Sequence, residues 1–442
     1  MTEQAQFPDL PPVVQSSTSG EQAVVPLRLS RANRQQVEWR MATLDELLPK
    51  LHPARSVWAF VEKQDLSDYV AETRAVEGHA GRPAIEPAVL LGLWLFATSQ
   101  GVGSAREIAR LTKEHDAYRW LCGGVSVNYH TLSDFRNQGK KLDDLLTRTL
   151  AVLTKEGLLT LERGAQDGMR VRASAGAASF RQRDTLEKHL REAEAQVQRL
   201  RNEDGAEAQA RSARQKAAQE RAARERQARL RRALELLPEA EATLQRQDKK
   251  PEEARTSTTD PEARVMKMAD GGFRPAFNFQ VVATARTRII VGVEAGNVGS
   301  DMAELPAMLD QLEERLGRLP DELLADGGYP SQGSLEDAYR RGVTVYAPVQ
   351  KPKDPGRDRY QPLPGDSEAR ATWRQRMGTD EAKEIYKERG ATIEWVNAVL
   401  RRFGLRFLTV RGLKKVRAVL LLAALAHNLF RVEAIRREQA AA

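Results

Sequence analysis

The chain of 442 residues contains a single cysteine, Cys122, and this scarcity is the first constraint on its chemistry. One cysteine excludes a disulfide framework and any structural zinc site of the CxxC type, so Cys122 is expected to be a small apolar core residue. Aromatic residues make up only 6% of the chain, but its 41% of hydrophobic residues is enough for two or three domains with sizeable cores. The composition therefore excludes a collagen-like or wholly disordered protein.

Several well-known catalytic motifs are also missing. The sequence has no GxxxxGK[ST] loop, no GxGxxG after a strand, no HExxH and no GxSxG. These absences argue against nucleotide-driven enzymes, hydride-transfer enzymes, zinc proteases and serine hydrolases.

Long hydrophobic runs are lacking as well. The N-terminus is polar, acidic and proline-bearing, unlike a secretory signal, and residues 1–40 are expected to be a disordered tail. The longest apolar run, 418–426, is far shorter than the roughly 20 residues that span a bilayer. We therefore expect a cytoplasmic protein in which this run is a buried helix.

Both signs of charge are abundant. The 69 Lys and Arg residues exceed the 61 Asp and Glu residues and give a formal net charge of +8. This surplus mildly favours a polyanionic partner, while the many carboxylates leave room for metal chemistry.

Residues 41–160 show apolar residues at helical spacing, which predicts an all-helical N-terminal domain. Within it, a glycine turn at 123–124 and a Thr131–Asp134 capping box predict a helix-turn-helix whose second helix presents Arg136, Lys140 and Lys141. Such a helix suits a major groove, although the same geometry is common in plain helical bundles.

Residues 179–264 are rich in Ala, Arg, Glu, Gln and Leu and predict a helical insert followed by a linker. Leucines and alanines recur at spacings of three and four on both sides of an interruption at 202–205, which favours an antiparallel coiled-coil hairpin, with a kink at Pro238. The hairpin could be a solvated arm, or an arm that grips DNA or dimerises.

The flanking segments, 161–178 and 265–437, predict a mixed sheet covered by helices. One strand lies near Asp167, a hairpin covers 277–296, and further strands cover 321–325 and 343–349, with helices between and after them. The fold class is therefore α/β (α+β): a helical N-terminal domain, then a sheet domain interrupted by the helical insert.

Acidic residues at strand ends are the clearest sign of catalysis. Asp167 and Asp326 each precede glycine where a strand is expected to give way to a turn, so their carboxylates can face a cleft. Asp-Gly is also a common turn dipeptide.

Glu394 lies on an expected helix from about Thr392 and shares a face with Arg401, seven residues on. If it faces the sheet, three carboxylates could meet and bind Mg²⁺ or Mn²⁺, which prefer oxygen ligands. The alternative for Glu394 is a surface salt bridge with Arg401 or Arg402.

The order of these motifs and the residues in them resemble those of the DDE transposases of bacterial insertion sequences. The similarity runs from about Leu44 to Arg431. Its segments are residues 81–96 with 130–138, QDGMRVRASA at 166–175, residues 260–282, ELLADGGYPS at 322–331, and residues 386–429.

This resemblance implies an RNase H-like catalytic domain with Asp167, Asp326 and Glu394 as a metal-binding triad. It implies Mg²⁺ as cofactor, with Mn²⁺ able to substitute, and cleavage followed by strand transfer through in-line displacement at phosphorus. Tyr386 and Arg389 resemble the family's signature around the last acid, where the Arg and a later Lys contact transposon-end phosphates. Arg401 stands at that later basic position.

The implied partners are double-stranded DNA, as transposon terminal repeats and as target, and further copies of the chain in a synaptic homo-oligomer associated with the nucleoid. Basic candidates for the DNA surface are Arg136, Lys140, Lys141, Arg170, Arg172, Arg411, Lys414, Lys415 and Arg417. Two other functions stay open: a DNA-binding regulator with an inactive RNase H-like domain, and a bridging protein that dimerises through the arm. Trp94, Trp120 and His427 are expected to be core residues.

Overall fold

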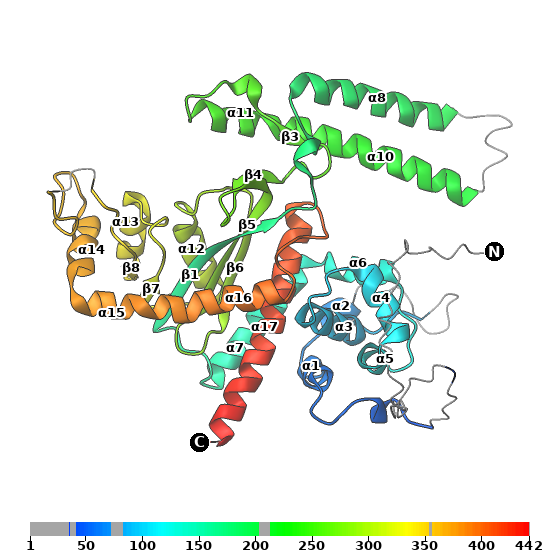
Figure 1. Ribbon diagram of the computed structural model, residues 1–442. Coiled ribbons are helices and arrows are strands. Elements are labelled where there is room, and N and C mark those ends of the chain that lie inside the picture. The colour runs from blue at the N-terminus through cyan, green and yellow to red at the C-terminus, as the bar shows by residue number, and fades with distance from the viewer. Residues whose placement is uncertain (1–34, 36–40, 72–82, 203–212, 353–355, 442) are drawn as a thin grey trace, which may run out of the picture. The chain divides into compact units, whose positions relative to one another are not determined.

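A computed structural model describes residues 35, 41–71, 83–202, 213–352 and 356–441, and Figure 1 shows the arrangement of its elements. The residues from Thr43 to Ala442 group into one compact unit. The tail expected at 1–40 lies almost wholly outside the described residues, so its disorder stays a prediction.

The N-terminal part is helical from Asp45 to Lys155, as predicted. Its elements are a short 3₁₀ turn at Asp45–Leu47 and the helices α1 (Pro53–Val61), α2 (Ser67–Val70), α3 (Pro87–Ser99), α4 (Ala105–Glu114), α5 (Asp116–Cys122), α6 (Tyr129–Arg136) and α7 (Gly139–Lys155). α3 is apolar on all sides and almost wholly buried, which suits the centre of a helical bundle. Cys122 and Trp94 are buried as expected, and Trp120 is partly buried.

The predicted start of the second helix of the helix-turn-helix is wrong. Asn128, not Thr131, caps α6: its side chain accepts hydrogen bonds from the backbone N–H groups of His130 and Thr131. α6 ends at Arg136, so Lys140 and Lys141 belong to the next helix, α7. The three basic residues therefore do not share one recognition helix.

The helical insert forms the expected hairpin of α8 (Arg183–Asn202) and α10 (Ala213–Glu235), which lie side by side (Figure 1). The helix is interrupted between α10 and α11 (Leu237–Gln245), and Pro238 occupies the first turn of α11. The leucine seam is confirmed: one apolar cluster joins Leu186 and Ala193 to Leu230 and Leu237. A second cluster joins Val197 and Leu200 to Ala223, which is the pairing of an antiparallel hairpin.

The sheet is mixed. Its strands are β1 (Arg163–Arg172), β4 (Arg264–Lys267), β5 (Phe273–Thr284), β6 (Ile290–Gly296), β7 (Glu322–Leu324) and β8 (Thr344–Tyr346). The order is β4-β5-β1-β7-β8, and β6 also pairs with β5. β1 pairs antiparallel with β5 and parallel with β7, so the sheet changes direction at β1. The short strand β4 was not predicted, and neither was the small ladder of β2 (Phe180–Arg181) with β3 (Thr256–Ser257).

Helices cover the sheet and separate its parallel strands. They are α12 (Glu304–Leu316), α13 (Gln332–Arg340), α14 (Glu368–Gly378), α15 (Asp380–Arg389), α16 (Trp395–Arg402) and α17 (Leu413–Ala441), with short 3₁₀ turns at Ala177–Ser179 and Pro251–Glu253. A π-helical turn, Gly390–Glu394, joins α15 to α16. α12 packs on β5 and β6, whereas the π-helical turn packs on β1 and β5.

Helix α17 is the longest helix among the described residues, and it contacts α3 and α7 as well as β6. By length and composition it could cross a membrane, but 72% of its most apolar window is buried inside the protein. Asn428 binds both the backbone N–H and the carbonyl of Ile290, each at 2.8 Å, and so completes the free edge of β6. The prediction of a buried helix at 418–426 is confirmed.

A single apolar core runs through the N-terminal helices and the sheet, with α17 between them. The boundary at 160 therefore marks a change of secondary structure inside one continuous core, whereas the insert that begins at 179 has apolar clusters of its own. Whether these segments fold as separate domains stays a prediction.

His427 provides a test of this core. It is 2% exposed, and its Nε2–H donates to the carbonyl of Arg288 at 2.8 Å. Burial lowers the pKa of His427 to about 4, so the folded protein holds the ring neutral while the unfolded chain takes up a proton near its ordinary value of 6.5. Stability is therefore lost as the pH falls from 6.5 towards 4.

We expect protonation of this histidine in the unfolded chain to lower the free energy of unfolding by about 2 kcal/mol as the pH falls from 7 to 5. His427→Gln should flatten that part of the pH dependence in urea unfolding. The exposed His130 serves as the control, and His130→Gln should leave the dependence as in the unmodified protein. Equal pH dependence in both variants would contradict the buried neutral ring.

Candidate catalytic site

Strand β1 places Asp167 in its middle, not at its end as the sequence suggested. β1 continues to Arg172 because β5 pairs with it from Gly164 to Arg172. On the other side, β7 pairs in parallel with Ala165 opposite Leu324. The same offset carried two residues further brings Asp167 level with Asp326, which follows the end of β7 as predicted. The two aspartates are therefore neighbours, with Asp167 inside β1 and Asp326 just beyond the end of β7.

The helix that carries Glu394 differs from the expected one. It does not begin near Thr392: α15, the π-helical turn and α16 follow one another from Asp380 to Arg402. A π-helical turn holds one residue more than an α-helical turn and is frequent at functional sites. Thr392 and Ile393 in the turn are buried, whereas the Glu394 side chain is 65% exposed, so this acid does not face inward as expected.

Arg389 joins the strands to this helix. Its Nη2 lies 2.9 Å from Oδ1 of Asp167, and its Nη1 lies 3.4 Å from Oε1 of Glu394. The Glu394 ion pair is thus with Arg389, not with Arg401 or Arg402. The side chains of Arg389 and Asp167 are 12% and 17% exposed, so their ion pair is largely shielded from water. One guanidinium therefore links two of the three predicted acids.

The charge balance at Asp167 reflects these neighbours. Burial raises the pKa of Asp167, the Arg389 guanidinium opposes that rise, and the negative charge of Asp326 adds to it. The pKa of the half-buried Tyr386 depends on the same groups: burial raises it, the Arg389 guanidinium opposes that rise, and the charges of Asp326, Asp167 and Glu394 add to it.

The second oxygen of Asp167 is also held. The amide Nδ2 of Asn397 donates to Asp167 Oδ2 at 2.8 Å, and Asn397 is 2% exposed. Sequence reasoning gave this asparagine no role. Asn397 is buried, whereas Glu394 three residues earlier is mostly exposed, so the spacing of the two residues did not indicate this contact.

A divalent ion was predicted to bind all three carboxylates. Among the described residues, no three side chains of Asp, Glu, His or Cys lie close enough together to hold one ion. Arg389 stands between two of the acids instead. The donors nevertheless suit Mg²⁺ or Mn²⁺, because all are carboxylate oxygens, and Asp326 uses only Oδ1, which accepts from Gly328 N–H at 2.7 Å.

A buried polar network that the sequence did not indicate lies on the other face of β1. Asp301 accepts hydrogen bonds from Asn278, Gln280 and Arg170 at 2.7–2.9 Å. Gln280 in turn accepts from the hydroxyl of the fully buried Tyr329 at 2.6 Å. Burial raises the pKa of Tyr329, so it stays a donor. The network ties β1 and β5 to the loop that follows Asp326.

Arg136 does not lie on a DNA-facing surface. It is 7% exposed, donates to the carbonyl of Gly103 at 3.0 Å, and its guanidinium stacks over Trp94. Burial lowers the pKa of Arg136 to about 10. Its expected contact with DNA is therefore replaced by a role in packing α3 against α6.

Three other basic candidates already have partners within the protein. Arg170 binds the carboxylate of Asp301, and Arg417 binds Asp143 and Glu294. Lys141 donates to the carbonyl of Asp68. These contacts make all three poor choices for phosphate binding, because each would first lose an internal partner.

Six of the predicted DNA contacts are exposed side chains: Lys140, Arg172, Arg401, Arg411, Lys414 and Lys415. None of the six forms a salt bridge within the described part of the chain, although Arg411 donates to the carbonyl of Ser174 at 3.2 Å. A Cβ added to Gly139, next to Lys140, would lie 3.8 Å from the carbonyl oxygen of Lys414, so α7 and α17 begin close to each other. Arg172 lies over the ring of Phe407, which is itself half exposed.

Comparison with known proteins gives two family matches. Residues 42–138 match the family described as transposase domain (DUF772), and residues 241–429 match the transposase DDE domain. No curated protein and no solved structure shows significant similarity to the chain. The second match begins at residue 241, so it contains Asp326, Arg389 and Glu394 but not Asp167.

Gly168 lies within β1 and not in a turn, and its close packing against Asp301 can be tested by substitution. A Cβ on Gly168 would lie within 2.9 Å of both the Asp301 carboxylate and Gln280 Nε2. We expect Gly168→Ala to lower the unfolding free energy by about 1–3 kcal/mol in urea denaturation. Gly333→Ala is the control, since a Cβ there meets nothing within 4 Å. Equal stability of the two variants would contradict the tight packing at Gly168.

Proposed function

We propose that this chain, which belongs to the DDE transposases of insertion-sequence type, cuts DNA at the ends of its element and joins those ends to target DNA through Asp167, Asp326 and Glu394. The observation that carries the proposal is the arrangement around Arg389. Segments more than 200 residues apart bring Asp167 and Glu394 to one guanidinium, and the strand register brings Asp326 level with Asp167.

The three carboxylates would hold divalent ions, with Mg²⁺ the expected cofactor and Mn²⁺ able to replace it. A bound ion of this kind supplies positive charge where oxygens bound to phosphorus become more negative during displacement. The metal-binding set would be Asp167, Asp326 and Glu394, matching the oxygen donors that these ions prefer.

The chain's own side chains supply orientation and charge. Asn397 fixes Oδ2 of Asp167, so that the carboxylate is held in one rotamer before any ligand arrives. Arg389 compensates the buried charge of Asp167 in the free protein. We propose that Arg389 leaves the carboxylates when an ion binds and then contacts a phosphate, for which its planar fork is well suited.

The proposed DNA surface consists of exposed basic residues around the site and on the helices beside it. Phosphate contacts of this kind give most of the affinity and make it depend on salt. The exposed residues proposed are Lys140, Arg172, Arg401, Lys414 and Lys415, and the partly buried Tyr386 and Arg389 beside the acids complete the set. The partners would be the terminal repeats and the target duplex, bound by more than one copy of the chain, on the bacterial nucleoid.

Strand cleavage is the direct test. A labelled duplex containing the DNA that flanks the gene should be nicked in Mg²⁺ or Mn²⁺ and not in EDTA. Asp326→Asn should lower the rate at least about 10³-fold while binding is retained, because the basic surface is unchanged. Asp248→Asn, at an exposed acid outside both the triad and its surroundings, is the matched control and should cut normally. Binding without cleavage by the unmodified chain would instead favour a DNA-binding regulator.

The displacement of Arg389 can be measured without DNA. Millimolar Mn²⁺ should raise the melting temperature of the unmodified chain, since a ligand that binds only the folded state stabilises it. Arg389→Gln should lower the Mn²⁺ concentration needed for half of the shift, because the competing cation is gone, and Asp167→Asn should abolish the shift.

Arg402→Gln provides the control for the lost charge. Arg402 is exposed on the same continuous helix and forms no salt bridge in the described residues, so its removal should leave the Mn²⁺ titration unchanged. If Arg389→Gln and Arg402→Gln titrate alike, Arg389 does not compete with the ion.

A further inference from the structure

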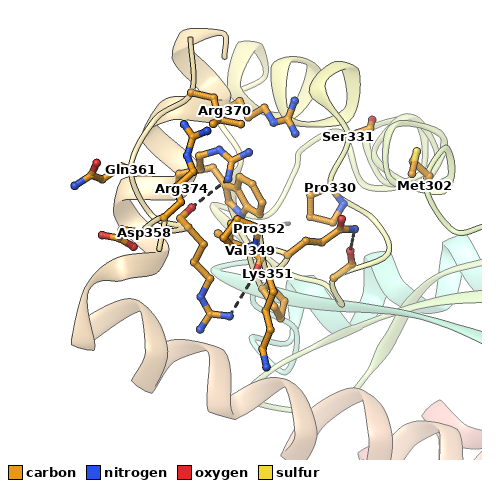
Figure 2. Close-up of a pocket in the computed structure, with 17 residues that line it drawn as sticks. Met302, Pro330, Ser331, Val349, Lys351, Pro352, Asp358, Gln361, Arg370 and Arg374 are labelled. Atoms are coloured by element: carbon orange, nitrogen blue, oxygen red, sulfur yellow. Dashed lines mark hydrogen bonds between the residues drawn. The ribbon is translucent and has the colours of Figure 1, made fainter. Parts of the chain in front are cut away.

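A basic pocket lies directly beside the loop of Asp326, and none of the residues predicted from the sequence belongs to it. Its volume is about 490 Å³, and Gly327, the residue after Asp326, lines it. Gln350 approaches the carbonyl of Gly327 at 3.4 Å and so joins the pocket wall to that loop. Figure 2 shows the pocket between Pro330 and Ser331 on one side and Arg370 and Arg374 on the other.

The charge of the pocket is strongly one-sided. Its lining contains the cations Lys351, Arg357, Arg359, Arg370 and Arg374 and a single acid, Asp358. Asp366 lies behind the wall and binds Arg370 at 3.2 Å and Arg374 at 2.8 Å. These two acids balance only two of the five cations.

Two of the guanidiniums are held in place. Asp366, whose side chain is 2% exposed, fixes Arg370 and Arg374, and Arg374 also donates to the carbonyl of Arg359 at 3.1 Å. Lys351 and Arg357, in contrast, are exposed and form no salt bridge in the described residues. The pocket thus combines a fixed basic wall with two exposed cations that have no ion-pair partner among the residues the structure describes.

We infer that this pocket binds phosphodiester groups of a DNA strand that runs past Asp326. The inference rests on the proposed function, since it places the reacting phosphate at Asp326. Successive phosphates of one strand advance about 3.4 Å along the duplex axis. A strand with one phosphate at Asp326 therefore places its next phosphates beside Gly327, where the five cations lie. The strand could belong to the element's end or to the target.

Salt-dependent binding tests the inference. The full chain carrying Lys351→Gln and Arg357→Gln would be compared with the unmodified chain by fluorescence anisotropy, in EDTA so that no strand is cut. One duplex carries the DNA that flanks the gene, and the other has an unrelated sequence. We expect binding of at least one duplex to weaken about ten-fold, and the slope of log K against log salt to fall by about two.

The control variant is Lys50→Gln with Lys155→Gln, which removes the same charge from two exposed lysines, one in the turn before α1 and one at the end of α7. Loss on the flanking duplex alone assigns the pocket to the element's end, and loss on the unrelated duplex alone assigns it to the target. Equal loss on both assigns it to a strand common to both complexes. If the pocket variant binds each duplex as tightly as the control variant does, the inference is overturned.

The result is separable from the proposed function. Weaker binding by the pocket variant, together with no cleavage by the unmodified chain, would leave the pocket as a DNA site and remove the catalytic proposal. Normal cleavage with unchanged binding by the pocket variant would remove the pocket alone. Both pocket substitutions are at exposed side chains, so the melting temperature should match that of the unmodified chain and confirm that each variant is folded.

Discussion

The pairing of β1 with two different neighbours is the constraint on which the site depends. β1 is antiparallel to β5 and parallel to β7, so its residues are fixed in register from both sides. Because side chains alternate across a strand, Asp167 faces the helix that carries Arg389, while Gln166 and Arg170 face the network around Asp301. A shift of one residue would exchange these two faces and place Asp167 among the polar groups under α12.

The two faces of β1 stabilise buried negative charge in different ways. The network face buries Asp301 permanently, and three donors satisfy its carboxylate, so that charge is stable without any ligand. The other face gathers carboxylates that repel one another, and the repulsion is relieved by Arg389. In the proposed reaction a bound divalent ion would take over from Arg389 as the charge that offsets these acids.

The sequence predicted the parts of this arrangement that depend on local pattern. The strands at 277–296 and 321–325, the leucine seam of the hairpin and the buried helix at 418–426 all follow from periodicity. Asp326 was found because a short apolar strand ends beside it. Asp167 was placed at a strand end because Asp-Gly usually marks a turn, whereas Gly168 is needed there to make room for Asp301, which is distant in sequence. Arg136 was misplaced for a similar reason, since its partners Trp94 and Gly103 are distant too.

Contacts between distant segments explain the rest. Arg389 and Asn397 meet Asp167 across more than 200 residues, and the helical insert lies between them in the chain. The inserted hairpin can vary without moving the acids, because its own apolar clusters are separate from the core that runs through the helices and the sheet. Helix α17 does the reverse: it contacts α3, α7 and β6 at once, so the basic residues at its start are held in a fixed relation to the strands that carry the acids. DNA bound at Lys414 and Lys415 would therefore be positioned relative to Asp167 by the core itself, and not by a flexible linker.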